Sequence, residues 1–233
     1  MKIWPFLILV LVSQSLLSQE LTGPEVLKKA IEFHDPNQAW PTFIGTLDIT
    51  METPNSGARR SLVHLDLPNS KFGLEVSKEQ NSYSFQLHKD ECKISLNGSS
   101  EISEEDAEKF RLSCERAKMY RNYYTYLYGL PMKLMNEGTY VDSKVQRKVF
   151  KGKEYLVVKV NYDEEVGKDT WYFYFDPKSF AMEVYQFFHD ESKNDGEYIL
   201  LSGMEVMNGV KMPKTRKWYY NKDNTYLGVD ILN

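Results

Sequence analysis

The chain has 233 residues, a length that suits one domain with a sizeable buried core. Its 29 basic and 33 acidic side chains give a net charge of −4, which argues against nucleic-acid binding because the phosphate backbone demands clustered Lys and Arg. The dense basic runs are short, Arg59-Arg60 and 214–217, and we interpret them as solvated strand ends.

The first eighteen residues have the pattern of a secretory signal peptide. Lys2 gives a charged start, residues 3–12 carry no charge, and small and polar residues mixed with leucine follow to Ser18. The apolar run is well short of the ~20 residues that span a bilayer, which disfavours a membrane anchor. We therefore expect cleavage near Ser18/Gln19, a signal peptide over 1–18, a single domain over 19–233, and a periplasmic or secreted protein that does not span the membrane.

A first helix is predicted from Thr22 to just before Pro36. Thr22 and Glu25 have the spacing of a capping box, and Pro24 suits a first helical turn. Apolar side chains then recur at helical spacing up to Phe33.

From Phe43 the apolar period changes to two. Alternating apolar and polar residues, interrupted by Pro, Asn, Ser and Gly, predict short antiparallel strands joined by turns. The alternating runs cover 43–51, 63–67, 72–76, 83–87 and 94–96.

A second helix is predicted from Ser103, a good N-cap followed by three acidic residues. We expect it to continue to about Leu127 and to stop before Gly129. Its C-terminal half is rich in tyrosine, which is typical of a helix that packs on a sheet with its hydroxyls reaching water. These tyrosines are Tyr120, Tyr123, Tyr124, Tyr126 and Tyr128.

Strands resume after this helix, and the total comes to roughly ten or eleven, a number that curls or closes rather than staying flat. The later strand runs are 156–162, 171–175, 182–188, 198–207, 215–220 and 225–231. The run 171–175 is aromatic at every position, so both of its faces must be covered. One face must pack on the core, and the other must meet a helix, a partner or an enclosed cavity.

The two cysteines, Cys92 and Cys114, are predicted to form a disulfide in an oxidising compartment. Two free buried thiols are the alternative, and a metal site lacks the necessary Cys/His spacing. A bond between them would join the second helix to the sheet.

No motif for catalysis or cofactor binding stands out. A serine elbow and a glycine-rich phosphate loop are both missing from the sequence. His34-Asp35 and His189-Asp190 are adjacent pairs, but neighbours on an extended chain point to opposite faces, which favours structural roles. We expect no catalytic residues, no metal and no cofactor.

Several motifs in a fixed order resemble a domain family of unknown function common in Bacteroidetes-type secreted proteins. The resemblance spans nearly the whole chain after the signal peptide, and that family is similar in fold to the outer-membrane lipoprotein carriers (the LolA/LolB-like superfamily). The motifs are His34-Asp35-Pro36 followed by Trp40 and Phe43, 128–134 followed by Gly138, a hairpin near Gly167, Phe175-Asp176-Pro177, and Gly209-Val210 before Met212-Pro213.

This resemblance implies a mainly β fold with two helices (α+β), a strongly curved antiparallel half-open barrel with the helices on its concave side. Such relatives hold acyl chains between the sheet and the helices. We therefore expect a non-catalytic binding protein for a lipid or another hydrophobic small molecule. The expected ligand-binding residues are Tyr123, Tyr124, Leu130, Met132, Trp171, Phe173 and Phe175.

Three alternatives remain at this point. The same aromatic side chains can simply fill a closed core. The protein can be a cell-envelope domain that binds another protein, or an enzyme that uses His34 and Asp35.

Overall fold

The computed structural model describes residues 20–89 and 91–233. The expected signal peptide and its cleavage site lie outside these residues.

Helix α1 (Gly23–His34) begins and ends as the sequence predicts. The Glu25 carboxylate accepts hydrogen bonds from both the amide and the hydroxyl of Thr22, each at 2.8 Å. Beyond the helix, Asp35 accepts hydrogen bonds from the amides of Ala39 and Trp40 at 2.7 and 2.9 Å, and so starts the short helix η1 (Trp40–Thr42). Asp35 therefore fixes the turn that leads into the sheet.

The first five strands are successive antiparallel hairpins. They are β1 (Ile44–Thr53), β2 (Ser56–Asp66), β3 (Lys71–Lys78), β4 (Asn81–His88) and β5 (Glu91–Leu96). The apolar member of each alternating pair faces one side of the sheet, where Leu47, Val63, Leu74 and Phe85 are all fully buried. This alternation confirms the predicted strand pattern, and we call this side the inner face.

The second half of the sheet is built from seven further strands. They are β6 (Thr139–Phe150), β7 (Lys153–Tyr162), β8 (Thr170–Phe175), β9 (Met182–Phe188), β10 (Glu197–Ser202), β13 (Thr215–Tyr220) and β14 (Tyr226–Leu232). A separate small hairpin contains β11 (Glu205–Met207) and β12 (Val210–Met212), and the short helix η3 (Glu191–Lys193) precedes β10.

In the described residues, twelve strands form one antiparallel sheet in the order β5-β4-β3-β2-β1-β14-β13-β10-β9-β8-β7-β6. Strand β14 pairs with β1 and so joins the two halves, while β5 and β6 are the two free edges. The sheet is therefore curved but not closed, which confirms the expected half-open barrel. The fold is mainly β with helices on the concave side, as expected.

The strand count from sequence was too low for three reasons. Strand β6 is mostly exposed, and its polar residues interrupt any apolar period. Strand β12 has only three residues and was not predicted. The run 198–207 is interrupted at Gly203, whose φ of +66° ends β10 before β11 begins.

The prediction of one continuous second helix was wrong. The chain forms α2 (Glu104–Lys109) and then α3 (Cys114–Gly129), followed by the short helix η2 (Met132–Met135). Arg111 has a left-handed φ of +53°, which stops α2, and the Ser113 hydroxyl accepts a hydrogen bond from the Arg116 amide to start α3. Cys114 is consequently the first residue of α3, not a mid-helix residue.

The predicted disulfide is confirmed. Cys92 on β5 is bonded to Cys114 at the start of α3, 22 residues further along the chain. The bond fixes the first turn of α3 to one edge strand of the sheet.

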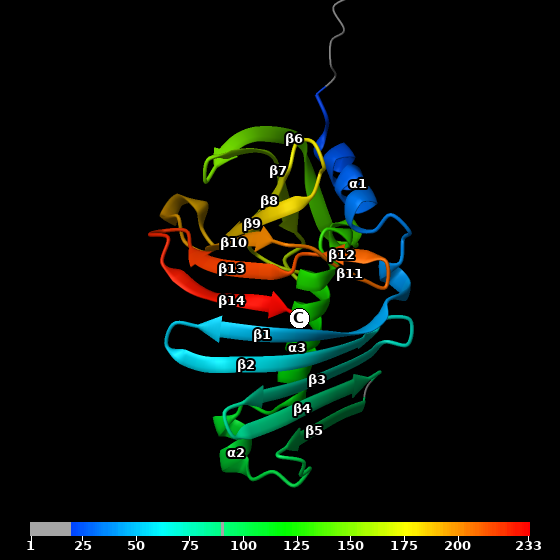
Figure 1. The fold of residues 1–233 in the computed structure, drawn as a ribbon, viewed down its shortest axis with the longest axis vertical. Helices are drawn as coiled ribbons and strands as arrows, with labels where there is room; N and C mark the ends of the chain where they lie inside the picture. The colour runs from blue at the N-terminus through cyan, green and yellow to red at the C-terminus, as the bar shows by residue number, and fades with distance from the viewer. Residues whose placement is uncertain (1–19, 90) are drawn as a thin grey trace, which may run out of the picture.

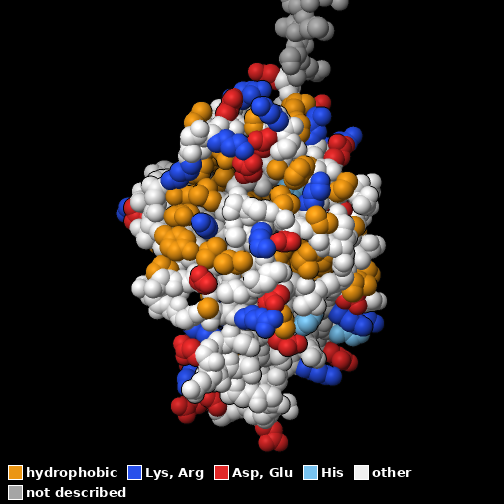
Figure 2. Space-filling view, viewed as in Figure 1, with side chains coloured by type: hydrophobic (Ala, Val, Ile, Leu, Met, Phe, Trp, Pro, Cys, Tyr) orange, Lys and Arg blue, Asp and Glu red, His pale blue; other side chains and the backbone are white. Residues whose placement is uncertain are grey.

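Helix α3 crosses the inner face of the sheet and lies behind the strands in Figure 1. It contacts β3, β4 and β5, while α1 packs on β6, β7 and β12. Figure 2 shows the opposite, outer face, where apolar side chains gather over the upper strands and are sparse over the lower ones.

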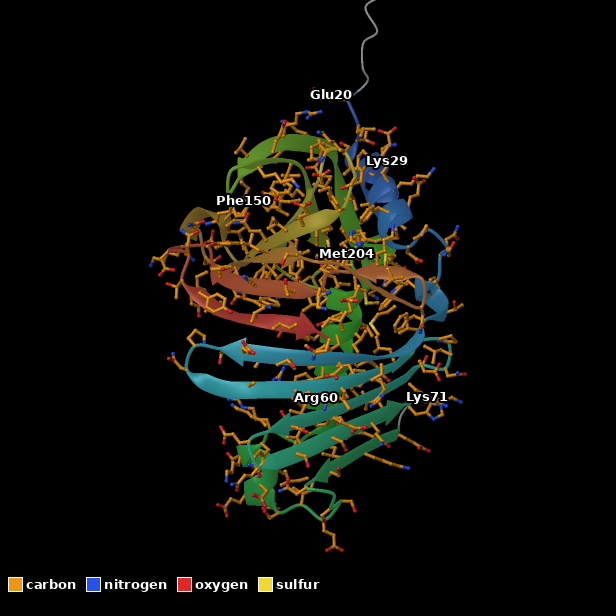
Figure 3. The ribbon with its side chains drawn as sticks, in the orientation of Figure 1. Glu20, Lys29, Arg60, Lys71, Phe150 and Met204 are labelled. Carbon is orange, nitrogen blue, oxygen red and sulfur yellow. A yellow bond between two sulfur atoms is a disulfide. The ribbon has the colours of Figure 1, made fainter. Side chains whose placement is uncertain are left out.

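The all-aromatic strand β8 has both faces covered, as its sequence requires. Trp171, Phe173 and Phe175 belong to the main core on the inner face. Tyr174 on the outer face joins a second, smaller core with Tyr155, Val157 and Val184. Phe150, at the end of the β6–β7 hairpin (Figure 3), lies 5.2 Å from the Tyr174 ring centre, so the chain's own hairpin helps to cover this face.

Candidate ligand-binding cleft

A cavity of about 540 Å³ lies between α3 and the strands β7 and β8; we call it the large cavity. Tyr123 and Tyr126 reach it from α3, Tyr162 from β7 and Trp171 from β8. Tyr123 and Tyr126 share one helix, Tyr162 and Trp171 lie on two neighbouring strands, and the packing of α3 on the sheet brings the two pairs together.

The aromatic wall of the large cavity is held by contacts among its own members. The rings of Tyr126 and Trp171 meet edge to face at 5.7 Å, and the Tyr126 and Tyr162 hydroxyls are hydrogen-bonded at 2.5 Å. Burial raises the pKa of Tyr162 to about 12 and that of Tyr126 well above its usual value, so both hydroxyls are neutral at physiological pH. This part of the wall is therefore aromatic with uncharged hydroxyl groups, while most of the other lining residues are polar: Asn122, Thr125, Lys133, Asn136, Glu137, Thr139, Glu165 and Asp169.

Charged residues line the rim of the large cavity. Lys133 is half-buried and burial lowers the pKa of its ammonium group, while Glu137, Glu165 and Asp169 supply carboxylates. The Asp169 carboxylate is paired with His189 at 2.6 Å, which raises the pKa of that histidine.

A second cavity of about 300 Å³ lies on the other side of Tyr123; we call it the small cavity. Met51, Trp218, Glu197 and Asp230 are among its lining residues, and all four belong to the sheet. Tyr123 lines both cavities, and its side chain is 38% exposed. Burial nevertheless raises the pKa of its hydroxyl well above the usual value, and the charge of Asp230 raises it further.

A row of ions lies under α3 next to the small cavity. Cross-strand pairing aligns Arg216 with Asp230, Asp230 with Met51, and Met51 with Arg59. Directly paired residues project from the same face of an antiparallel sheet, so the row faces α3.

Arg216 and Arg59 show that the interpretation of both basic runs as solvated strand ends was wrong in part. Arg216 is only 1% exposed and its guanidinium stacks on the Tyr128 ring at 3.8 Å. Arg59 is partly buried and donates to the Tyr124 hydroxyl at 3.3 Å, whereas its neighbour Arg60 is exposed as expected. The burial of Arg216 could have been predicted from sequence, because Arg216 and Trp218 alternate with Lys217 and so share the inner face.

The seven residues expected to bind ligand fall into two groups. Tyr123 and Trp171 line the large cavity together. The other five are packed in the main core with exposures of 8% or less: Tyr124, Leu130, Met132, Phe173 and Phe175. None of these five lines the large cavity, and ligand contact by any of the seven stays a prediction.

The candidate catalytic pair has structural partners. Both ring nitrogens of His34 are hydrogen-bonded to backbone atoms, at 2.8 Å to Lys211 and 3.0 Å to Met182, and Asp35 caps η1. Across residues 20–89 and 91–233 no group of three or more His, Cys, Asp or Glu side chains has the arrangement of a metal site.

Comparisons with known proteins agree with the fold. A protein-family model described as "Family of unknown function (DUF6503)" matches residues 2–232. No curated protein matches the chain.

Among solved structures, a LolA superfamily protein from Nitrosomonas europaea is similar over 92% of both chains, with a TM-score of 0.54 and 11% identity. A DUF1329 family protein from Desulfovibrio piger is similar over 92% of both chains, with a TM-score of 0.51 and 7% identity. At these identities the likeness establishes the LolA-like fold. Within the part of the chain that the structure describes, no helix has the length and apolar character to cross a bilayer.

Proposed function

The chain belongs to the DUF6503 family of unknown function, and from that premise we propose that it is a non-catalytic binding protein for a lipid or another hydrophobic ligand. The ligand would lie in the cleft between α3 and the inner face of the sheet. The LolA-like fold supports this proposal by analogy only, and analogy between folds is weak evidence for function.

The observation that carries the proposal is the large cavity itself. Its volume of about 540 Å³ falls within the range of small-molecule sites, roughly 300–1,000 Å³. Such sites are typically apolar with a few well-placed polar groups. In the large cavity the aromatic rings of Tyr123, Tyr126, Tyr162 and Trp171 supply the apolar surface, and the tyrosine hydroxyls and the other polar lining residues supply the polar groups.

We further propose that the protein acts outside the cytoplasm, in the periplasm or as a secreted protein. The signal-peptide pattern of residues 1–18 supports export, and the Cys92–Cys114 disulfide fits an oxidising compartment. The intact mass of the exported protein tests this, because it should correspond to a chain that begins near Gln19.

Titration of the exported protein with an environment-sensitive fatty-acid probe tests binding. We expect saturable binding that unlabelled lipid displaces and that Trp171→Ala weakens about tenfold, since an aromatic side chain contributes on the order of 1–2 kcal/mol to an apolar contact. Tyr172→Ala is the matched control, because Tyr172 is the next residue of β8 and faces outward. No binding of any lipid class by the folded protein would refute the proposal.

One observation favours a protein-interaction domain as the second candidate. On the outer face, the rings of Tyr198 and Tyr219 stack at 5.1 Å and Tyr226 lies 5.4 Å from Tyr219. Of these three, only Tyr226 is more than a third exposed, while Tyr198 is 3% exposed. The exposed aromatic area is therefore small, and the carrier function is better supported.

A further inference from the structure

The wall of the small cavity carries negative charge and no positive charge. Its charged lining residues are Glu197 and Asp230, and no Lys, Arg or His lines it. The remaining wall is mostly apolar, with the aromatic rings of Tyr123 and Trp218 on two sides. The large cavity differs, because Lys133 lies on its rim.

In residues 20–89 and 91–233, Glu197 forms no ion pair within 4.0 Å, although the charge of His189 acts on it from a greater distance. It lies on the inner face of β10, half-buried, where burial raises the pKa of its carboxyl and the charge of His189 lowers it only in part. A cation bound beside this carboxylate would offset the cost of its burial.

Asp230 presents a second oxygen to the same space. The residue is 7% exposed, and its Oδ2 accepts a hydrogen bond from Trp218 Nε1 at 3.1 Å. Within the described parts of the chain, no donor is hydrogen-bonded to its Oδ1. A nine-tenths-buried carboxylate thus keeps one acceptor oxygen unused.

The neighbouring guanidinium groups point elsewhere. Arg216, the cross-strand partner of Asp230, stacks on Tyr128 and donates to the Pro213 carbonyl oxygen at 2.9 Å. Arg59 donates to the Tyr124 hydroxyl. Burial raises the pKa of the Asp230 carboxyl and the charges of both guanidinium groups lower it in part, but neither arginine lines the small cavity.

Proteins bind ammonium groups with aromatic rings and carboxylates, because the ring faces attract the cation and the carboxylates neutralise its charge. We propose that the small cavity binds the ammonium head of a cationic amphiphile, whose apolar chain passes Tyr123 into the large cavity. This inference rests on the proposed function and names its ligand class.

Three probes with the same decyl chain separate the two proposals: decyltrimethylammonium, decanol and decanoate, each below its micelle concentration. We expect the ammonium probe to bind about tenfold more tightly than decanol, which corresponds to a cation–aromatic contact with a carboxylate nearby. Decanoate should bind more weakly than decanol. Equal affinity for the ammonium probe and decanol would overturn this inference and leave the proposed function standing, whereas no binding of any probe would overturn both.

Glu197→Gln tests the assigned carboxylate. The ratio of ammonium to decanol affinity should fall several-fold in this variant, because the amide has nearly the same shape without the charge, while Asp230 and the aromatic rings keep part of the preference. Glu154→Gln is the control, since Glu154 is an exposed acid paired with Arg147 on the β6–β7 hairpin. A ratio unchanged in Glu197→Gln, or lowered equally in both variants, would contradict the site.

Discussion

The imidazole of His34 accepts a hydrogen bond from the backbone amide of Met182, with 3.0 Å between the amide nitrogen and Nε2. The proton of the neutral ring is therefore on Nδ1, which donates to the Lys211 carbonyl oxygen at 2.8 Å. One side chain thus joins the end of α1 to β9 and β12. Burial, as the main cause, lowers the pKa of His34 to about 4.

We predict that this histidine makes the fold sensitive to acid. The folded-state pKa of about 4 lies below the usual 6.5, so the unfolded chain binds the extra proton between these values. The contribution of neutral His34 to the free energy of unfolding is complete above about pH 6.5. It is lost as the pH falls toward 4, which lowers the free energy of unfolding by about 3 kcal/mol. Chemical denaturation across this range measures it.

His34→Gln is the comparison that isolates this effect. The variant should be less stable at neutral pH, and its free energy of unfolding should fall less steeply from about pH 6.5 to 4, since its side chain does not titrate. Parallel curves for the two proteins would contradict the assignment.

The Cys92–Cys114 bond gives a second prediction. Closing a loop of this length lowers the entropy of the unfolded chain. In the chain-entropy model this raises the free energy of unfolding by about 3 kcal/mol. The exported, denatured protein should show no free thiol, and the Cys92→Ala/Cys114→Ala double variant should lose stability by about that amount in urea unfolding. Two titratable thiols without reductant would contradict the bridge.

Local sequence patterns were sufficient to predict most of the strands and the cap of the first helix. The alternation around Leu47 and Val63 and the Thr22 cap depend on neighbours within a few residues, so the sequence alone predicts them. Strand β6 and the break at Arg111 could not be found this way. An edge strand does not need an apolar face, and arginine is not a residue type that favours the left-handed conformation found at Arg111.

The site was predictable only in part, because its geometry is set by long-range packing. Tyr123 and Tyr124 are adjacent in the same helix, yet Tyr123 lines both cavities while Tyr124 is 2% exposed and belongs to the core. Which neighbour faces the cleft depends on the rotation of α3 over the sheet. The carboxylates Glu197 and Asp230 were missed because both faces of β10 and β14 carry apolar side chains, so alternation does not show which face is the inner one.

Gly129 is predicted to be essential for the packing of the α3 C-terminus. A methyl group at this position would lie 2.4 Å from a ring carbon of Trp40 and 2.7 Å from the Lys133 side chain. Gly129→Ala should therefore destabilise the fold by about 1–3 kcal/mol through overpacking. Gly167→Ala is the control, because its nearest neighbour would be 3.9 Å away. Thermal unfolding compares the two, and equal midpoints would count against this close contact.

Tyr123 narrows the passage between the two cavities, and removing its ring should widen it. Its side chain is already 38% exposed, so Tyr123→Ala should cost little stability while enlarging the space open to a ligand chain. We expect the variant to prefer longer acyl chains than the wild type, measured by displacing a fluorescent fatty acid with alcohols of increasing length. Tyr226→Ala is the matched control, since Tyr226 is also 38% exposed but lies on the outer face. The same chain-length optimum in all three proteins would show that the cavities do not act as one site.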